Sequence, residues 1–158
     1  MDVPNPNQAN SALTYYVQFG PITDESLRVT SSLLVQIMRE PSFNVLRTQE
    51  QLGYIVHCSA WLLPGGTLKG VRIVVQSEKP PSYLEERVEA FLVGMQKTIE
   101  EMTPEVFEEQ KDGLKRKWLE ADKNLAEETA RYNTHITTGQ YDFLRCKWRL
   151  WSCGLSIC

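Results

Sequence analysis

The stretch FNVLRTQEQLGYIV, residues 43–56, joins two different periodic patterns. Up to Gly53 the apolar residues recur at helical spacing, and from Tyr54 onward they alternate with polar residues as they do in a strand. The stretch therefore predicts a short helix from residue 43 to about residue 51, a tight turn at Gly53 and a strand that begins at Tyr54. Arg47 and Tyr54 stand on either side of this turn, and their function has to be explained.

A strand and a longer helix are predicted upstream of this junction. Apolar and polar residues alternate between residues 12 and 19, and Gly20-Pro21 ends the run. Thr23 is placed to cap the helix that follows, and Pro41 is expected to break it. The residues that recur at helical spacing are Leu27, Thr30, Leu34, Ile37 and Met38.

The strand that begins at Tyr54 is predicted to be one half of an antiparallel hairpin. Its alternation runs to Leu62, and Pro-Gly-Gly at residues 64–66 makes a turn. Val71, Ile73 and Val75 mark the return strand.

Three further helices are predicted after the hairpin. Their start signals are a capping box of Ser82 and Glu85, the pair Thr103-Pro104, and Asn124 with Glu127, and Gly139 stops the last helix. The residues expected to face inward are Leu84, Val88, Phe91, Leu92, Met95 and Ile99, then Phe107, Leu114 and Trp118, then Tyr132 and Ile136. This order of elements predicts an α+β fold with a largely antiparallel sheet and helices packed on one face.

Composition limits the class of protein. A chain of 158 residues with 42% apolar and 23% charged residues can bury one core. The net charge of −3 argues against a nucleic-acid surface, and no apolar run is long enough for a membrane span. The N-terminus lacks the character of a signal peptide, so we expect a cytoplasmic protein with reduced cysteines. Small polypeptides or metabolites are the favoured partners.

The search for catalytic motifs is largely negative. His57 and His135 lie far apart, and neither belongs to a spacing that would place zinc ligands on one face. Glycine-rich phosphate loops and nucleophile elbows are absent from the sequence as well. We therefore predict that this chain binds no metal or cofactor and carries no catalytic residue of its own.

Three runs of sequence, at residues 46–56, 74–92 and 102–107, closely resemble the insulin-degrading enzyme group of the insulinase/pitrilysin metalloproteases. They read LRTQEQLGYIV, VVQSEKPPSYLEERVEAFL and MTPEVF. The resemblance covers residues 11–143 and points to the last of four related domains, in the C-terminal lobe. It implies that residues 1–10 are a linker remnant, that the domain is C-terminally incomplete, and that residues 144–158, LRCKWRLWSCGLSIC, are a divergent tail without regular structure.

The resemblance also implies that the zinc site and the substrate-contacting residues of this chain lie on different lobes. In that family zinc is held by an inverted H-x-x-E-H motif on the N-terminal lobe, and the two lobes enclose a peptide substrate. By motif, Arg47 and Tyr54 are the residues of this chain that reach the substrate and support the transition state, with Gln51 and Gly53 as supporting residues. Such donors are useful because negative charge builds on the substrate carbonyl oxygen during peptide hydrolysis.

Taken from the residues alone, a structural explanation of this pair stays open. Arg47 could pair with Glu50 on its own short helix, and Tyr54 could be a core aromatic residue with a hydrated hydroxyl group.

Two alternatives to the role of a substrate-binding domain also stay open. One is a stand-alone interaction or assembly domain, including a homo-oligomer. The other is a truncated or misspliced fragment without function, because the sequence after residue 143 departs from the family pattern.

Overall fold

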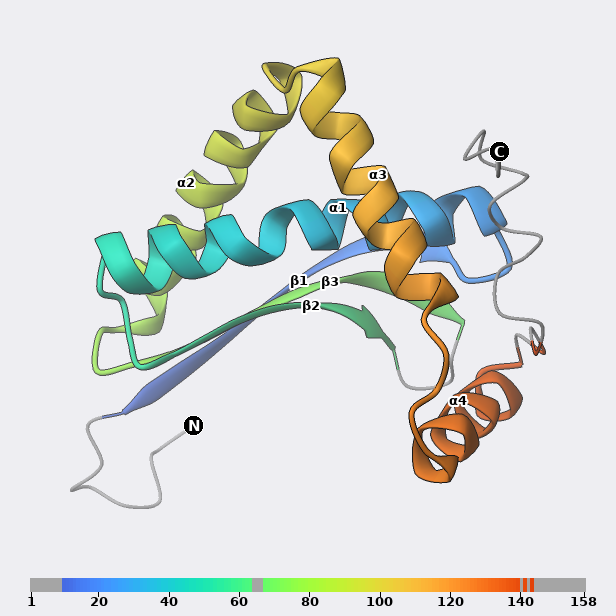
Figure 1. The fold of residues 1–158 in the computed structure, drawn as a ribbon. Coiled ribbons are helices and arrows are strands. Elements are labelled where there is room, and N and C mark those ends of the chain that lie inside the picture. The colour runs from blue at the N-terminus through green and yellow to red at the C-terminus, as the bar shows by residue number, and fades with distance from the viewer. Residues whose placement is uncertain (1–9, 64–66, 140, 142, 144–158) are drawn as a thin grey trace. The chain divides into compact units, whose positions relative to one another are not determined.

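The computed structural model describes residues 10–63, 67–139, 141 and 143 (Figure 1). Its elements are β1 (Ser11–Pro21), α1 (Glu25–Ser42), the π-helix η1 (Phe43–Gln49), β2 (Ile55–Leu62), β3 (Leu68–Ser77), α2 (Pro81–Glu100), α3 (Pro104–Leu119) and α4 (Leu125–Thr137). The predictions for the linker remnant before Asn10, for the turn at residues 64–66 and for the tail lie outside the described residues. None of the described helices is both long and apolar enough to cross a bilayer.

The strands form a three-stranded antiparallel sheet in the order β1-β3-β2. The hairpin of β2 and β3 is confirmed, and the Leu63 N–H donates to the Leu68 carbonyl at 3.0 Å near its closed end. Val71, Ile73 and Val75 of the central strand are at most 2% exposed and alternate with half-buried residues, which fits a strand with one face packed on the core. The predicted α+β fold class is therefore confirmed.

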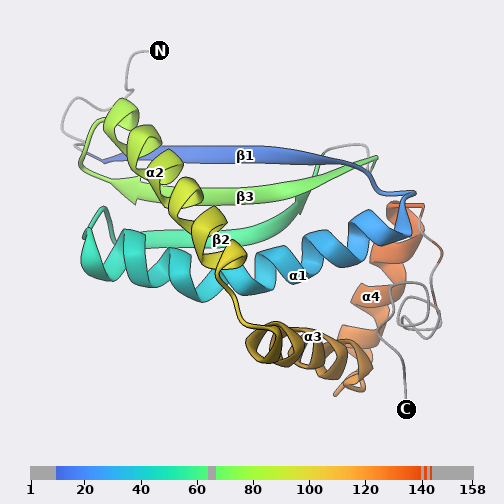
Figure 2. The ribbon, with the colours of Figure 1, turned by 90° about the horizontal axis from the view of Figure 1, so that it is seen from above.

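The chain divides into two compact units, and several elements continue from one into the other. Unit 1 comprises Met1–Val17, Ile37–Ser59 and Arg72–Met102. In it α2 packs against η1 and crosses over the strands, as Figure 2 shows. The predicted stripe of α2 is confirmed by the burial of Leu84, Val88, Phe91 and Met95. Leu46 of η1 is fully buried and gives this part of the chain its anchor.

Unit 2 comprises Gln18–Gln36, Ala60–Val71 and Thr103–Cys158. In this unit α1 and α3 are joined by the Gln36 amide, which donates to the Gln110 carbonyl at 2.8 Å. Leu114 of α3 is buried as predicted, whereas Phe107 is 39% exposed. The predicted caps of the last two helices are confirmed at Thr103 and at Asn124, whose side chains accept from the Val106 N–H and the Glu127 N–H.

Two of the predicted helix starts are wrong. Helix α1 is capped by Asp24, whose carboxylate accepts from the Leu27 N–H at 3.0 Å, and not by Thr23. Helix α2 starts at Pro81 after the N-cap residue Pro80, with no side-chain cap. A proline at the first helical position needs no cap for its own missing N–H, so the Ser82 box is not required.

Pro41 was predicted to break the helical run, but it lies inside α1 and the run continues past it. Helix α1 continues to Ser42 and passes directly into η1, which is helical as predicted but wider than an α-helix. The Glu50 N–H reaches back five residues to the Val45 carbonyl at 2.9 Å. A wider turn next to a proline is a known way for a helix to absorb the lost hydrogen bond.

The inward faces of two helices also differ from the prediction. Thr30 of α1 is exposed, while its neighbours Val29 and Ser31 are buried. In α4 none of the described side chains is buried, and Tyr132 and Ile136 are 36% and 55% exposed. The amphipathic pattern therefore predicted α4 correctly but did not identify a packing partner.

Candidate functional site

The candidate site lies in unit 1, where η1 meets β2. Arg47 is in the last turn of η1, and Tyr54 stands one residue before β2 begins. The buried residues Leu46 and Leu52 fix the ends of the intervening turn, since both are at most 2% exposed. The Leu46 carbonyl also accepts a backbone hydrogen bond of 2.9 Å from the Leu52 N–H. The turn is thus anchored to the core on both sides.

The structure brings Arg47 and Tyr54 together. The guanidinium carbon of Arg47 lies 5.2 Å from the centre of the Tyr54 ring and 4.8 Å from the centre of the Phe43 ring. Tyr54 is 83% exposed and Phe43 is 41% exposed, so the arrangement is open to solvent on one side. Cation–π contacts of this kind restrain the guanidinium without using its N–H donors.

Both structural explanations of the pair are wrong. Glu50 does not pair with Arg47, because the two oxygens of its carboxylate accept from Arg87 of α2 at 2.8 and 2.6 Å. Tyr54 is not a core residue, given its exposure. Among the described residues, no carboxylate forms an ion pair with Arg47. The N–H donors of Arg47 therefore have no acidic partner in the described part of the chain.

The tight turn is built differently from the prediction. The left-handed residue is Gln51, with a φ of 50°, and not Gly53. A Cβ at Gly53 would lie 1.8 Å from the Gln76 carbonyl oxygen, so glycine is needed here because the backbone passes directly against β3. Gln51 is exposed and contributes to the turn through its backbone conformation rather than through packing.

A pocket of about 470 Å³ opens beside Tyr54. It is lined by the turn and the start of β2 on one side and by the end of β3 on the other: Asn10, Gln51, Gly53, Tyr54, Ile55, Gln76, Ser77, Glu78 and Lys79. The lining contains the Lys79 ammonium group, the Glu78 carboxylate, the hydroxyl groups of Tyr54 and Ser77, three side-chain amides and apolar surface. It can accommodate a polar side chain next to the exposed face of Tyr54.

The described residues do not fit a zinc site. They contain no group of three or more His, Cys, Asp or Glu side chains that could hold a metal ion. His57 of β2 and His135 of α4 belong to different units. Any metal chemistry linked to Arg47 and Tyr54 would need ligands from other residues.

Comparison with known proteins identifies the family. Residues 33–133 match the family model described as PQQ synthase PqqF-like, C-terminal lobe domain 4. The chain belongs to the insulinase/pitrilysin metalloprotease family, as a C-terminal lobe domain. The resemblance of the sequence runs to this family is thereby confirmed.

Relatives within the insulinase/pitrilysin family are similar over most of the chain. Human insulin-degrading enzyme is 49% identical over 113 residues, which is 72% of this chain and 11% of that enzyme. A Schizosaccharomyces pombe protein named as a putative zinc protease is 40% identical over 143 residues, 90% of this chain and 15% of its own. The crystal structure of pitrilysin matches with a TM-score of 0.76 and 28% identity over 95% of this chain and 16% of that chain. The chain thus spans about a sixth or less of these relatives.

Two residues that support the turn of this insulinase-family domain were missed in the sequence. Arg87 lies 37 positions from Glu50, and the Ser77 hydroxyl donates to the Leu52 carbonyl from 25 positions away. The Ser77 contact has no local signal in the sequence, and the signal for Arg87 is weak because an arginine on a charged helix face is ordinary. The one available signal was the short run of Glu85, Glu86 and Arg87, in which the arginine lies directly beside Val88 of the buried stripe.

Proposed function

We propose that this chain is the substrate-facing part of the C-terminal lobe of a zinc metalloendopeptidase, in which Arg47 and Tyr54 donate hydrogen bonds to a substrate peptide. The observation that carries the proposal is the position of the Arg47 guanidinium. It is held against the exposed ring of Tyr54, and its donors have no carboxylate partner among the described residues. A cation restrained in this way is suited to an incoming carbonyl oxygen.

The zinc ion in this proposal belongs to a separate N-terminal lobe, and this chain supplies none of its ligands. The task of this chain is to help enclose the peptide and to place two donors at its backbone. The pocket next to Tyr54 would take a substrate side chain adjacent to the carbonyl that the pair holds. The chain alone is accordingly expected to be inactive.

The test is reconstitution with a separately expressed N-terminal lobe that carries the H-x-x-E-H motif. Peptide cleavage should appear on mixing, and it should fall by about a hundred- to a thousandfold with Arg47→Ala, with a smaller loss for Tyr54→Phe. Lys97→Ala, a change of an exposed cation at the far end of α2, is the matched control. Rescue that is insensitive to Arg47→Ala would contradict the proposal.

The second candidate, an interaction or assembly domain, is favoured by the surface of α4. Leu125 is 76% exposed and Ile136 is 55% exposed on a helix with no buried residue. Surfaces of this kind occur at protein–protein contacts. Light scattering after size exclusion separates the two candidates. A concentration-dependent oligomer that dissociates with Ile136→Ser, combined with no rescue of cleavage, would favour assembly.

A further inference from the structure

Four consecutive residues connect Arg47's helix to Tyr54, and each is fixed in a different way. We call residues 50–53 the connector. Glu50 is bound to Arg87, Gln51 is left-handed, Leu52 is buried, and Gly53 lies against β3. Because the connector has only four residues, a change in its backbone conformation moves Arg47, Tyr54 or both.

The contact between Glu50 and Arg87 joins residues far apart in sequence through two short hydrogen bonds. The Arg87 Nε donates to Glu50 Oε2 at 2.8 Å, and its Nη2 donates to Glu50 Oε1 at 2.6 Å. The two side chains are 35% and 20% exposed. A bidentate pair of this kind fixes both distance and plane, which a single contact from a lysine would not do.

Glu50 also ends η1. It is the C-cap residue, with its N–H on the Val45 carbonyl, and the next residue adopts the left-handed conformation. A left-handed conformation at a residue other than glycine has to be held by the surrounding structure. The Arg87 contact is made at the residue directly before it, so it restrains the direction in which the chain leaves the helix.

The other side of the connector is tied to β3. The Ser77 hydroxyl donates to the Leu52 carbonyl, and the Lys79 N–H donates to the same hydroxyl at 3.0 Å. Helix α2 therefore holds the connector at Glu50, and strand β3 holds it at Leu52. Of these two contacts, only the one from α2 is made with Glu50, the residue that caps the helix of Arg47.

We propose that Arg87 is a positioning residue for the substrate-binding pair: through its bidentate contact with Glu50 it keeps the Arg47 guanidinium against Tyr54. The inference rests on the proposed function and adds a residue to it. The bidentate contact of Arg87 is made with Glu50 rather than with either member of the pair, so Arg87 acts through the connector. Loss of the contact lets the end of η1 rotate, and Arg47 then leaves the Tyr54 ring.

The inference is tested on the intact 158-residue chain by NMR and in the reconstituted peptidase by kinetics. The Arg47 side-chain NεH resonance lies in the ring currents of Phe43 and Tyr54 and reports their contact directly. Tyr54→Leu gives the resonance position without the tyrosine ring. We expect Arg87→Ala to move the Arg47 signal most of the way to that position, and Arg87→Lys to move it partly.

In the kinetic assay Arg87→Ala should lower kcat about tenfold with little change in KM, because a small misplacement of a donor costs rate rather than general binding. Exchanging the charges in the double variant Glu50→Arg with Arg87→Glu should restore part of both readouts. The matched control is Lys111→Ala, which removes an ion pair of 2.8 Å with Glu108 from α3. The Lys111→Ala variant should leave both the Arg47 resonance and kcat unchanged.

The outcomes separate the inference from the proposed function. If Arg47→Ala reduces cleavage while Arg87→Ala leaves the Arg47 resonance and kcat unchanged, the positioning role is refuted and the proposed function stands. If Arg47→Ala has no effect on cleavage, the proposed function fails, and the NMR shift alone decides whether Arg87 holds the pair. If Arg87→Ala does not fold, the milder Glu50→Gln and Arg87→Lys variants are read by the same two criteria.

Discussion

Gly53 is the residue whose side-chain space is most tightly limited in the candidate site. Its ideal Cβ position is 1.8 Å from the Gln76 carbonyl oxygen and 3.2 Å from the Cα of Ser77, both in the backbone of β3. Backbone atoms cannot rotate away as a side chain can. Gly53→Ala should therefore cost about 3 kcal/mol or more of unfolding free energy, measured by urea denaturation.

Gly94 provides the matched control for this prediction. It lies inside α2 in the same unit, and an added Cβ there would meet nothing within 4 Å. Gly94→Ala should stabilise the protein by about 0.5–1 kcal/mol, since glycine lowers helix stability. Equal effects of the two substitutions would contradict the close approach of Gly53 to β3.

Glu50 should give the stability of the domain a measurable pH dependence. The hydrogen bonds from Arg87, aided by the charges of Arg87 and Lys79, lower the pKa of Glu50 below its ordinary value of 4.5, while burial opposes this. A lowered pKa in the folded state means that the contact stabilises at neutral pH and is lost as the pH falls through that pKa.

The measurement compares the wild type with Glu50→Gln by urea denaturation at several pH values. The difference in unfolding free energy should be largest near about pH 7 and should shrink once the pH falls below the ordinary value of 4.5 and through the lowered pKa of the folded state, because the carboxylate then becomes protonated. A difference that stays constant over this range would show that the carboxylate charge does not stabilise the fold.

At the residue scale, the sequence singled out a pair of side chains that the structure brings together, but not the contacts that hold them there. Arg47 and Tyr54 stand in one continuous motif, and the structure places them in contact. Arg87 and Ser77 could not be predicted, because contacts over 37 and 25 positions depend on how helices and strands pack. The left-handed conformation of Gln51 was missed for a related reason, since a nearby glycine is the usual choice for such a position.

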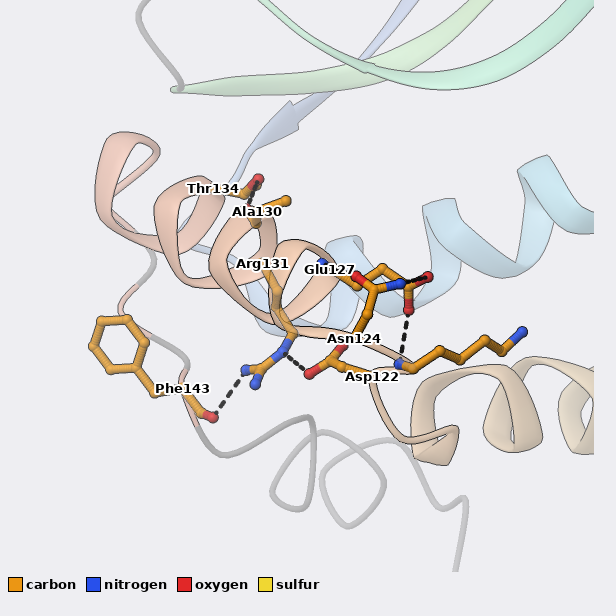
Figure 3. Close-up of polar contacts among 8 residues, drawn as sticks. Asp122, Asn124, Glu127, Ala130, Arg131, Thr134 and Phe143 are labelled. Carbon is orange, nitrogen blue, oxygen red and sulfur yellow. Dashed lines mark hydrogen bonds and ion pairs between the residues drawn. The ribbon is translucent and has the colours of Figure 1, made fainter.

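At the element scale, α4 depends on its N-terminal cap. The Asn124 side chain accepts from the Glu127 N–H at 2.9 Å, and the Glu127 carboxylate accepts from the Lys123 N–H at 2.9 Å and from the Asn124 amide (Figure 3). Because no side chain of α4 is buried, packing contributes little to this helix. Asn124→Ala should cost about 1 kcal/mol of helix stability.

Hydrogen exchange measured by mass spectrometry can check this cap. Peptides that cover residues 125–137 should exchange faster in Asn124→Ala than in the wild type, by about fivefold for a loss of about 1 kcal/mol. Thr103→Ala is a useful comparison, because the Thr103 hydroxyl lies 3.5 Å from the Val106 N–H and α3 has the buried residue Leu114. A larger effect at Thr103 than at Asn124 would contradict this argument.

The elements themselves were largely predictable, and their limits were less so. Hydrophobic period and turn residues identified the strands and helices, including the buried return strand β3. The signals that failed were those with two interpretations: Pro41 can break a helix or widen it, and Ser82 can cap a helix or follow a proline start. The prediction for Tyr132 failed for a different reason, since periodicity shows a face but not its partner.

At the scale of the whole molecule, this chain corresponds to a small part of each of its longer relatives. The segments that two relatives share with it make up 11% and 15% of their own lengths, and the described residues contain no group of three or more potential metal ligands. Under the proposed function, the position of the Arg47 and Tyr54 donors depends on this chain, while the rate of cleavage depends also on the separate lobe that carries the zinc. Substitutions in the connector should therefore alter catalysis without altering metal content.

The behaviour of the isolated chain toward zinc tests this division directly. Because no three potential ligands gather among the described residues, neither equimolar zinc nor a chelator should change the melting temperature of the 158-residue chain. The measurement is calorimetry at neutral pH with reduced thiols, and the triple variant Cys146→Ser, Cys153→Ser and Cys158→Ser serves as the control. A zinc-dependent rise in the melting temperature that persists in this variant would place metal ligands in the domain itself. In that case the donor role of Arg47 and Tyr54 would have to be reconsidered beside a metal site of their own chain.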